Sequence, residues 1–224
     1  MCLGGKEMKK FLMAMAAAFL VSTPSYAAQG DIAFPSDVIK KETLTVMDAL
    51  AFRRSSRNFI DKDLTIVQLA KVLWAANGLN SFDGKRVNPA ALGVYSIEVY
   101  AVTREGVYLY EPENRKLKLI AKGDYRSATT TGQGFVAKAG LNLVYVETPD
   151  AWKSARHTPP PRERQIDYAN IAVGAMVQSV ALTAQTEGLG NCVRGSINRD
   201  EFKKIAKLSD DKTILLAQSV GYTG

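Results

Sequence analysis

"IDYANIAVGAMVQSVALTAQTEGLGNCVRG", residues 166–195, contains the longest helical pattern in the chain. Alanine and glycine recur along it, at positions 169, 172, 174, 175, 181 and 184. Because small side chains let another backbone approach closely, we expect residues 166–187 to form a central helix at a tight interface. Gly188 is a typical residue after a helix C-terminus. Residues 191–197 then predict a short strand.

Three further segments carry helical signals. Apolar residues recur at helical spacing over residues 45–53. Thr65 and Gln68 form a capping-box pattern that opens a nearly all-apolar, and therefore buried, helix ending before Gly78. Asn198, with Glu201 three residues later, predicts a capped helix through Lys207.

The remaining patterned segments are strands. They cover residues 96–103, 107–114, 116–120, 141–146 and 214–220. Gly106 and the Pro112-Glu113-Asn114 run are turn signals between the first three, which predicts a meander. Residues 123–140 are ambiguous, with a short helix expected around Phe135. The element order predicts one α+β domain in which helices flank a central, mostly antiparallel sheet.

The N-terminus is typical of an export signal. Two lysines precede an apolar run over residues 11–21, and Ser25-Tyr26-Ala27 is a small-x-small cleavage pattern. We therefore expect a signal peptide at 1–27, an extended arm at 28–44, a domain at 45–224, and a periplasmic or secreted protein. The apolar run is shorter than the ~20 residues of a bilayer span, so no stable membrane insertion is expected after cleavage; an uncleaved anchor is the alternative.

The charge and the cysteine and histidine content of the chain argue against two classes of function, nucleic-acid binding and metal binding. The chain has 29 Lys+Arg against 22 Asp+Glu, and loss of three lysines and one glutamate with the leader lowers its formal charge of +7 by two units. The basic residues form no arginine-rich tail, which argues against nucleic-acid binding. Cys2 leaves with the leader, so Cys192 has no disulfide partner, and one cysteine with one histidine argues against a protein-built metal site. His157, in a proline-rich loop, is most simply a surface residue.

A basic cluster follows the first helical pattern. In "RRSSRNF", residues 53–59, Arg53, Arg54 and Arg57 flank Ser55 and Ser56. Guanidinium groups bind phosphate in a bidentate fashion, and hydroxyls beside them add donors. The cluster therefore predicts a site for a small multivalent anion, with a solvated basic face as the alternative.

Five segments in register resemble the nitroreductase family. They are "RRSSRNF", "LAKVLWAANGLN", "RVNPAALGVYSIEVYAV", the stretch quoted at the start, and "LLAQSVGYTG", which together span nearly all of residues 49–224. Within that family, these sequence segments are most similar to the SagB-type dehydrogenases, or azoline oxidases. The catalytic Lys-Tyr pair of that branch has no counterpart that we can place here, so ring oxidation of a peptide is not expected.

The resemblance implies an FMN-dependent oxidoreductase that is a homodimer with flavins at the subunit interface. Arg53, Ser55 and Arg57 match positions that hold the FMN phosphate and ribityl chain, and Arg54 contributes main chain. Pro89, Ala90 and Ala91 match the loop against the isoalloxazine. Arg194 and Gly195 match the loop whose backbone N–H faces flavin N5.

The resemblance also implies a reaction. Its expected form is ping-pong electron transfer through flavin N5 from a small-molecule donor to a small acceptor, such as a nitroaromatic or quinone, with no catalytic side chain required. NAD(P)H is not expected outside the cytoplasm, so the donor stays open. Many relatives continue past the equivalent of Gly224 with another basic phosphate contact, so Arg53 and Arg57 are expected to bear more of the phosphate binding here. The alternatives are an exported flavin-binding protein or electron relay without turnover, and an anion-binding module that has lost the flavin.

Overall fold

A computed structural model describes residues 30–35, 44–80 and 84–224. The strands are β1 (Ile32–Ala33), β2 (Ile97–Val102), β3 (Gly106–Glu111), β4 (Lys116–Lys122), β5 (Leu141–Glu147), β6 (Gly190–Arg194) and β7 (Thr213–Gly221). The helices are α2 (Val46–Phe52), α3 (Ile66–Asn77), α4 (Arg162–Thr186) and α5 (Arg199–Ala206), with 3-10 turns η1 (Ala91–Gly93), η2 (Arg126–Thr129), η3 (Gly134–Lys138) and η4 (Pro149–Ser154). The signal-peptide prediction, residues 1–27, lies outside the described residues.

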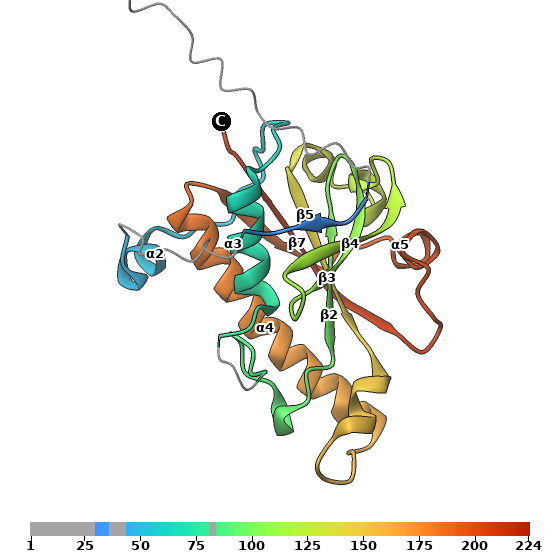
Figure 1. The fold of residues 1–224 in the computed structure, drawn as a ribbon. Helices are drawn as coiled ribbons and strands as arrows, with labels where there is room; N and C mark the ends of the chain where they lie inside the picture. The colour runs from blue at the N-terminus through green and yellow to red at the C-terminus, as the bar shows by residue number, and fades with distance from the viewer. Residues whose placement is uncertain (1–29, 36–43, 81–83) are drawn as a thin grey trace, which may run out of the picture.

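The strands form one sheet in the order β1-β4-β3-β2-β5-β7-β6, and each pair of neighbours is antiparallel. The meander prediction is confirmed, because β2, β3 and β4 pair in succession. Helices flank this sheet on both faces (Figure 1), which confirms the predicted α+β architecture.

Alternate residues of the strands enter two separate cores. On one face, Val99 and Ala101 pack with α3 and α4. On the other face, Tyr100 and Val102 pack with α5, whose Phe202 meets the Tyr100 ring edge-on. This division follows from the period of two along a strand. The sheet is therefore the middle layer of three, and the two-helix side forms the larger core.

Local capping explains where two of the helices begin. Thr65 and Gln68 make both hydrogen bonds of the predicted capping box on α3. Asn198 accepts a hydrogen bond from the Glu201 backbone N–H at the start of α5. The central helix α4 begins at Arg162, four positions before the predicted start, because Pro161 occupies its N-cap and Arg162 pairs with the buried Glu147.

The described part of the N-terminal arm is attached to the sheet edge. Ile32 and Ala33 pair with β4, and the Asp31 carboxylate accepts hydrogen bonds from Lys116 Nζ and the Leu119 backbone N–H, both at 2.9 Å. These bonds lower the pKa of Asp31. The extended conformation predicted for the arm is thus found in the residues that the structure describes.

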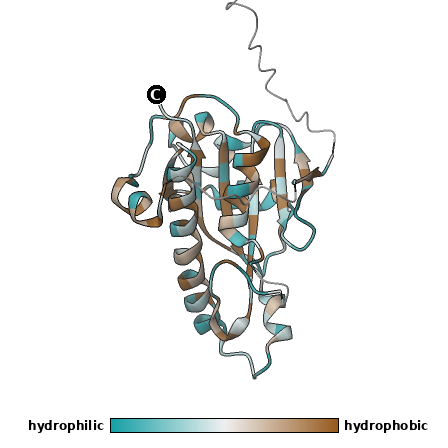
Figure 2. Cartoon of the chain, turned by 60° about the vertical axis from the view of Figure 1, so that its left-hand side comes forward, coloured by the Kyte–Doolittle hydropathy of each residue, from teal (hydrophilic) through white to brown (hydrophobic). Residues whose placement is uncertain are grey.

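The first helix presents its apolar side chains to the outside. Val46, Met47 and Phe52 are 67%, 72% and 62% exposed, and only Ala49 of α2 is buried. Figure 2 shows this short helix as a partly hydrophobic projection from the body. We call Val46, Met47, Leu50 and Phe52 the α2 apolar face. Among the described residues, no helix combines the length and the apolarity needed to cross a bilayer.

Candidate functional site

The arginine-serine segment lies along the outer edge of β6. Ser55 forms a parallel bridge with Asn191, and the Ser56 backbone N–H donates to the Asn191 carbonyl at 2.7 Å. A Cβ at Gly190 would lie 2.4 Å from Thr223 Cγ2 and 2.8 Å from Ser56 Cβ. Gly190 therefore permits the close approach that places residues 53–57 beside the strand leading to Arg194 and Gly195.

The three arginines of this segment have different environments. Arg54 turns back and donates to the carbonyls of Ala51 and Arg53, at 3.2 and 2.8 Å, so its side chain caps α2. Arg53 is half-buried and Arg57 is exposed. No carboxylate of residues 30–35, 44–80 or 84–224 forms an ion pair with Arg53 or Arg57. Their two charges remain available to an anion.

Phe59 fixes the far end of the segment. Its ring is 4% exposed and packs with Ala139, Cys192 and the Phe135 ring. The backbone continues this attachment, because Phe59 bridges Thr223 and the Ile60 N–H donates to the Tyr222 carbonyl at 3.0 Å. Packing and hydrogen bonds thus hold residues 55–60 in register with β6 and the end of the chain.

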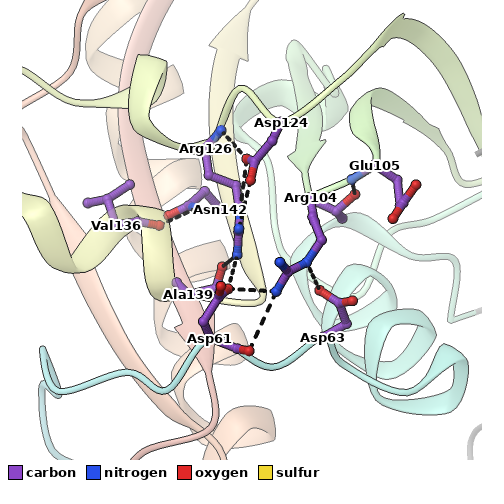
Figure 3. Close-up of polar contacts among 10 residues, drawn as sticks. Asp61, Asp63, Arg104, Glu105, Asp124, Arg126, Val136, Ala139 and Asn142 are labelled. Carbon is purple, nitrogen blue, oxygen red and sulfur yellow. Dashed lines mark hydrogen bonds and ion pairs between the residues drawn. The ribbon is translucent and has the colours of Figure 1, made fainter. Parts of the chain in front are cut away.

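A cluster of arginines and aspartates holds the chain at Asp61, directly after Ile60 (Figure 3). Arg126, only 2% exposed, donates to Asp124, to Asp61 Oδ1 at 2.9 Å and to the Ala139 carbonyl at 3.3 Å. Arg104 reaches the same Asp61 oxygen at 2.7 Å. Hydrogen bonding from Arg126 holds the pKa of Asp61 below its usual range. Burial opposes the charge of Arg126, but hydrogen bonds to Asp124 and Asp61 outweigh it and raise the pKa of Arg126.

The loop at residues 89–91 is attached elsewhere on the molecule. The buried Asn88 donates to the carbonyls of Ala75 and Ala76, at 2.7 and 2.9 Å, and accepts from Ser179 Oγ at 2.6 Å. Pro89 is exposed, whereas Ala90 and Ala91 are half-buried. Figure 1 shows this loop well separated from α2 within one chain. The structure therefore places residues 55 and 56 beside Asn191, on the strand that leads to Arg194 and Gly195, whereas the loop at 89–91 is attached to α3 and α4 through Asn88.

Arg194 is buried, whereas the next residue, Gly195, is exposed. The Arg194 side chain is 2% exposed and enters the protein, where it donates to the Thr129 carbonyl at 3.0 Å, Thr129 Oγ1 at 3.1 Å and Asn142 Oδ1 at 3.3 Å. Gly195 is exposed, and a Cβ there would meet open space. The backbone is therefore exposed at Gly195, and the adjacent Arg194 side chain is a buried cation.

The polar residues that hold the Arg194 side chain were not predicted from the sequence. Asn142 interrupts the apolar run of β5, accepts from Arg194 and from Ser219 Oγ at 2.6 Å, and donates to the Val136 carbonyl at 3.0 Å. A lone asparagine in a buried strand is the signal that could have identified it, because buried polar groups need partners. His157 is exposed in its loop, as predicted.

Comparisons with known proteins place this arrangement in a family. The sequence model of the Nitroreductase family matches residues 50–222. A candidate nitroreductase of Methanocaldococcus jannaschii is 29% identical over 184 residues, which cover 78% of this chain and 90% of that protein. The crystal structure of a candidate nitroreductase from Ralstonia eutropha JMP134 superposes with a TM-score of 0.78 at 31% identity and covers 87% of this chain and 90% of its own.

A more distant structure shares the fold. An FMN-dependent nitroreductase from Clostridium difficile R20291 has a TM-score of 0.53 at 17% identity, over 79% of this chain and 87% of that one. The family match and the two nearer relatives agree with the resemblance read from the five sequence segments. The chain belongs to the nitroreductase family, whose members are FMN-dependent oxidoreductases.

Proposed function

We propose that this protein binds FMN with its phosphate on residues 53–57. Arg53 and Arg57 would supply charged hydrogen bonds, Ser55 a hydroxyl, and Arg54 main chain only, because its guanidinium caps α2. The observation that carries the proposal is that Arg53 and Arg57, which flank the serines beside β6, form no ion pair with a carboxylate of the described residues. The donor set fits a phosphate dianion, and Gly195 leaves open surface at the other end of the strand.

The ring of the cofactor would lie at that other end. Four residues of extended chain, about 14 Å at ~3.4 Å per residue, separate Asn191 beside the anion site from Gly195. Backbone N–H groups of residues 194–195 would face the redox-active edge. Such donors are fixed before the reaction, so they stabilise developing negative charge without reorganisation. Their position is supported by the buried Arg194 contacts described above.

A second copy of the chain would complete the site. Residues 89–91 are the remaining cofactor-binding segment, and they lie apart from residues 53–57 of the same chain. The α2 apolar face and Ile171 of α4, which is 70% exposed, offer exposed hydrophobic surface. Surfaces of this kind mark protein interfaces. A homodimer in which residues 89–91 of one chain meet residues 53–57 and 194–195 of its partner accounts for both observations.

The proposed activity is electron transfer from a small donor to a small acceptor, such as a nitroaromatic or quinone. When bound, FMN would supply the two-electron chemistry of a ping-pong cycle. The residues of the chain would bind the phosphate, orient the ring and donate hydrogen bonds, with no side-chain acid or base. Export through the predicted signal peptide would place this reaction in the periplasm or outside the cell, and the donor there is part of the proposal to be tested.

The direct test is steady-state kinetics on FMN-loaded protein. Donors to screen are NADH, NADPH and reduced viologens, each paired with a nitroaromatic and a quinone acceptor. Parallel double-reciprocal lines support the proposal. A flavin that is reduced but passes no electrons to any acceptor would instead indicate a relay without turnover, and a protein that binds anions but no FMN would indicate a binding module.

A further inference from the structure

Two arginines in this protein are equally buried but differently partnered. Arg126 and Arg194 are each 2% exposed. Arg126 is neutralised by Asp124 and Asp61. Within the described parts of the chain, Arg194 has no carboxylate partner, and it donates hydrogen bonds to the neutral oxygens of Thr129, Asn142 and Ser196. Its Nε makes no hydrogen bond to any residue that the structure describes.

An unpaired buried charge is costly. Buried charges in proteins are normally paired, because removing an ion from water without compensation is strongly unfavourable. The effect is visible in the two arginines, since burial lowers the pKa of Arg194 to about 10, whereas the pKa of Arg126 is raised. Arg194 still carries its charge at neutral pH. Cys192, two positions earlier on the same strand, is a buried free thiol.

The position of this charge indicates what would compensate it. The buried Arg194 immediately precedes the exposed Gly195, at the edge where the proposed cofactor ring would sit. Reduction of FMN by two electrons and one proton leaves a net negative charge on the ring, and charge near that ring tunes its electronics. In a low-dielectric interior, a fixed cation acts on such a charge more strongly than it would in water.

We infer that Arg194 is an electrostatic positioning residue, whose buried and unpaired guanidinium favours the reduced form of the bound flavin and raises its reduction potential. The inference rests on the proposed function. It assigns a role to the side chain, in addition to the backbone role of residues 194–195. A purely structural Arg194 would support the loop through Thr129 and Asn142 but would leave the potential unchanged.

The test compares the affinities of wild type and variants for oxidised and dithionite-reduced FMN, together with a dye-coupled redox titration. Arg194→Gln and Arg194→Met remove the charge, and Arg194→Lys retains it. Arg199→Gln removes an arginine five positions away, whose guanidinium donates to the carbonyls of Ile214 and Leu215. For the neutral variants we expect the preference for reduced FMN to fall about tenfold, equivalent to ~30 mV for a two-electron couple. We expect Arg194→Lys and Arg199→Gln to stay near wild type.

Apoprotein stability provides a second readout. Because Arg194→Met removes both an unpaired buried charge and the hydrogen bonds to Thr129 and Asn142, the unfolding midpoint without FMN checks that each variant stays folded. Neutral variants that bind FMN with the wild-type potential would overturn the inference, as would a lysine variant shifted as far as the neutral ones. A wild-type protein that takes up no FMN would overturn the proposed function and, with it, this inference. Should Arg194→Met fail to fold, Arg194→Gln, which keeps hydrogen-bond donors, decides the matter.

Discussion

Replacing Arg53 by alanine should weaken FMN binding without unfolding the protein. Arg53 is half-buried at the C-cap of α2, where its backbone N–H donates to the Ala49 carbonyl at 2.9 Å and its carbonyl accepts from Arg54 at 2.8 Å. Its guanidinium pairs with no described carboxylate, so removing it breaks no ion pair within the described chain. The loss should therefore appear in ligand binding and only weakly in stability.

The magnitude follows from the interaction that is removed. A hydrogen bond to a charged group contributes about 1.5–3 kcal/mol, and 1.4 kcal/mol corresponds to a factor of ten. Arg53→Ala should thus raise the FMN dissociation constant about 10- to 150-fold. Half-burial favours the upper part of this range, because partial exclusion of water strengthens the contact.

The assay is fluorescence titration of FMN into apoprotein, with circular dichroism as the check on folding. Arg164→Ala is a matched control, since it removes an exposed arginine of α4 that forms an ion pair with Asp167 at 3.6 Å and lies over the Tyr168 ring. A folded Arg53→Ala protein with the wild-type dissociation constant would refute the phosphate assignment. An equal loss in the Arg164→Ala control would show that net charge, and no specific contact, governs binding.

Four further outcomes test other parts of the structure. Arg54→Ala should change FMN affinity far less than Arg53→Ala in the same titration, because the Arg54 guanidinium is occupied by α2 carbonyls; an equal loss would contradict the main-chain role. Cys192→Ser should keep its activity per folded molecule while losing about 1–3 kcal/mol in a urea unfolding curve, since the thiol is 1% exposed; an inactive folded variant would give the thiol a role in the reaction. Met47→Glu on the α2 apolar face should yield monomers in analytical ultracentrifugation, unlike Lys204→Glu on α5, and unchanged dimers would exclude this surface. Arg126→Met should lower the free energy of unfolding by about 3 kcal/mol. It should also reduce the dependence of that free energy on pH at acidic pH. Because hydrogen bonding from Arg126 lowers the pKa of Asp61, that stability is complete above the ordinary carboxylate pKa near 4 and is lost as pH falls below it; a variant with the wild-type dependence on pH would contradict this.

Local signals predicted most of the fold. The Thr65 capping box and the turn signals around Gly106 act over a few residues, so α3 and the β2-β3-β4 meander follow from the sequence. The predicted start of α4 was wrong because the first turn of this helix is polar and follows prolines, a sequence that is typical of a loop. Gly78 ends α3 for a reason that the sequence hides: its φ is −72°, and a Cβ would lie 2.3 Å from Trp74 Cδ1.

The site was less predictable than the fold. A helical apolar pattern over residues 45–53 predicts a helix but cannot say whether the α2 apolar face packs within its own chain or stays exposed. Arg194 was assigned from the resemblance through its backbone. The burial of its side chain depends on Thr129 of η2 and Asn142 of β5, two segments far away in the sequence. Such long-range contacts have no local periodic pattern, and residues 123–140 in particular showed none.

Uptake of FMN by the purified protein, residues 28–224, tests the central claim most directly. We predict that dialysis against excess FMN leaves one flavin per protomer, detected by visible absorption, and that Arg53→Ala binds less under the same conditions. A colourless wild-type protein that remains folded and retains no FMN would contradict the account.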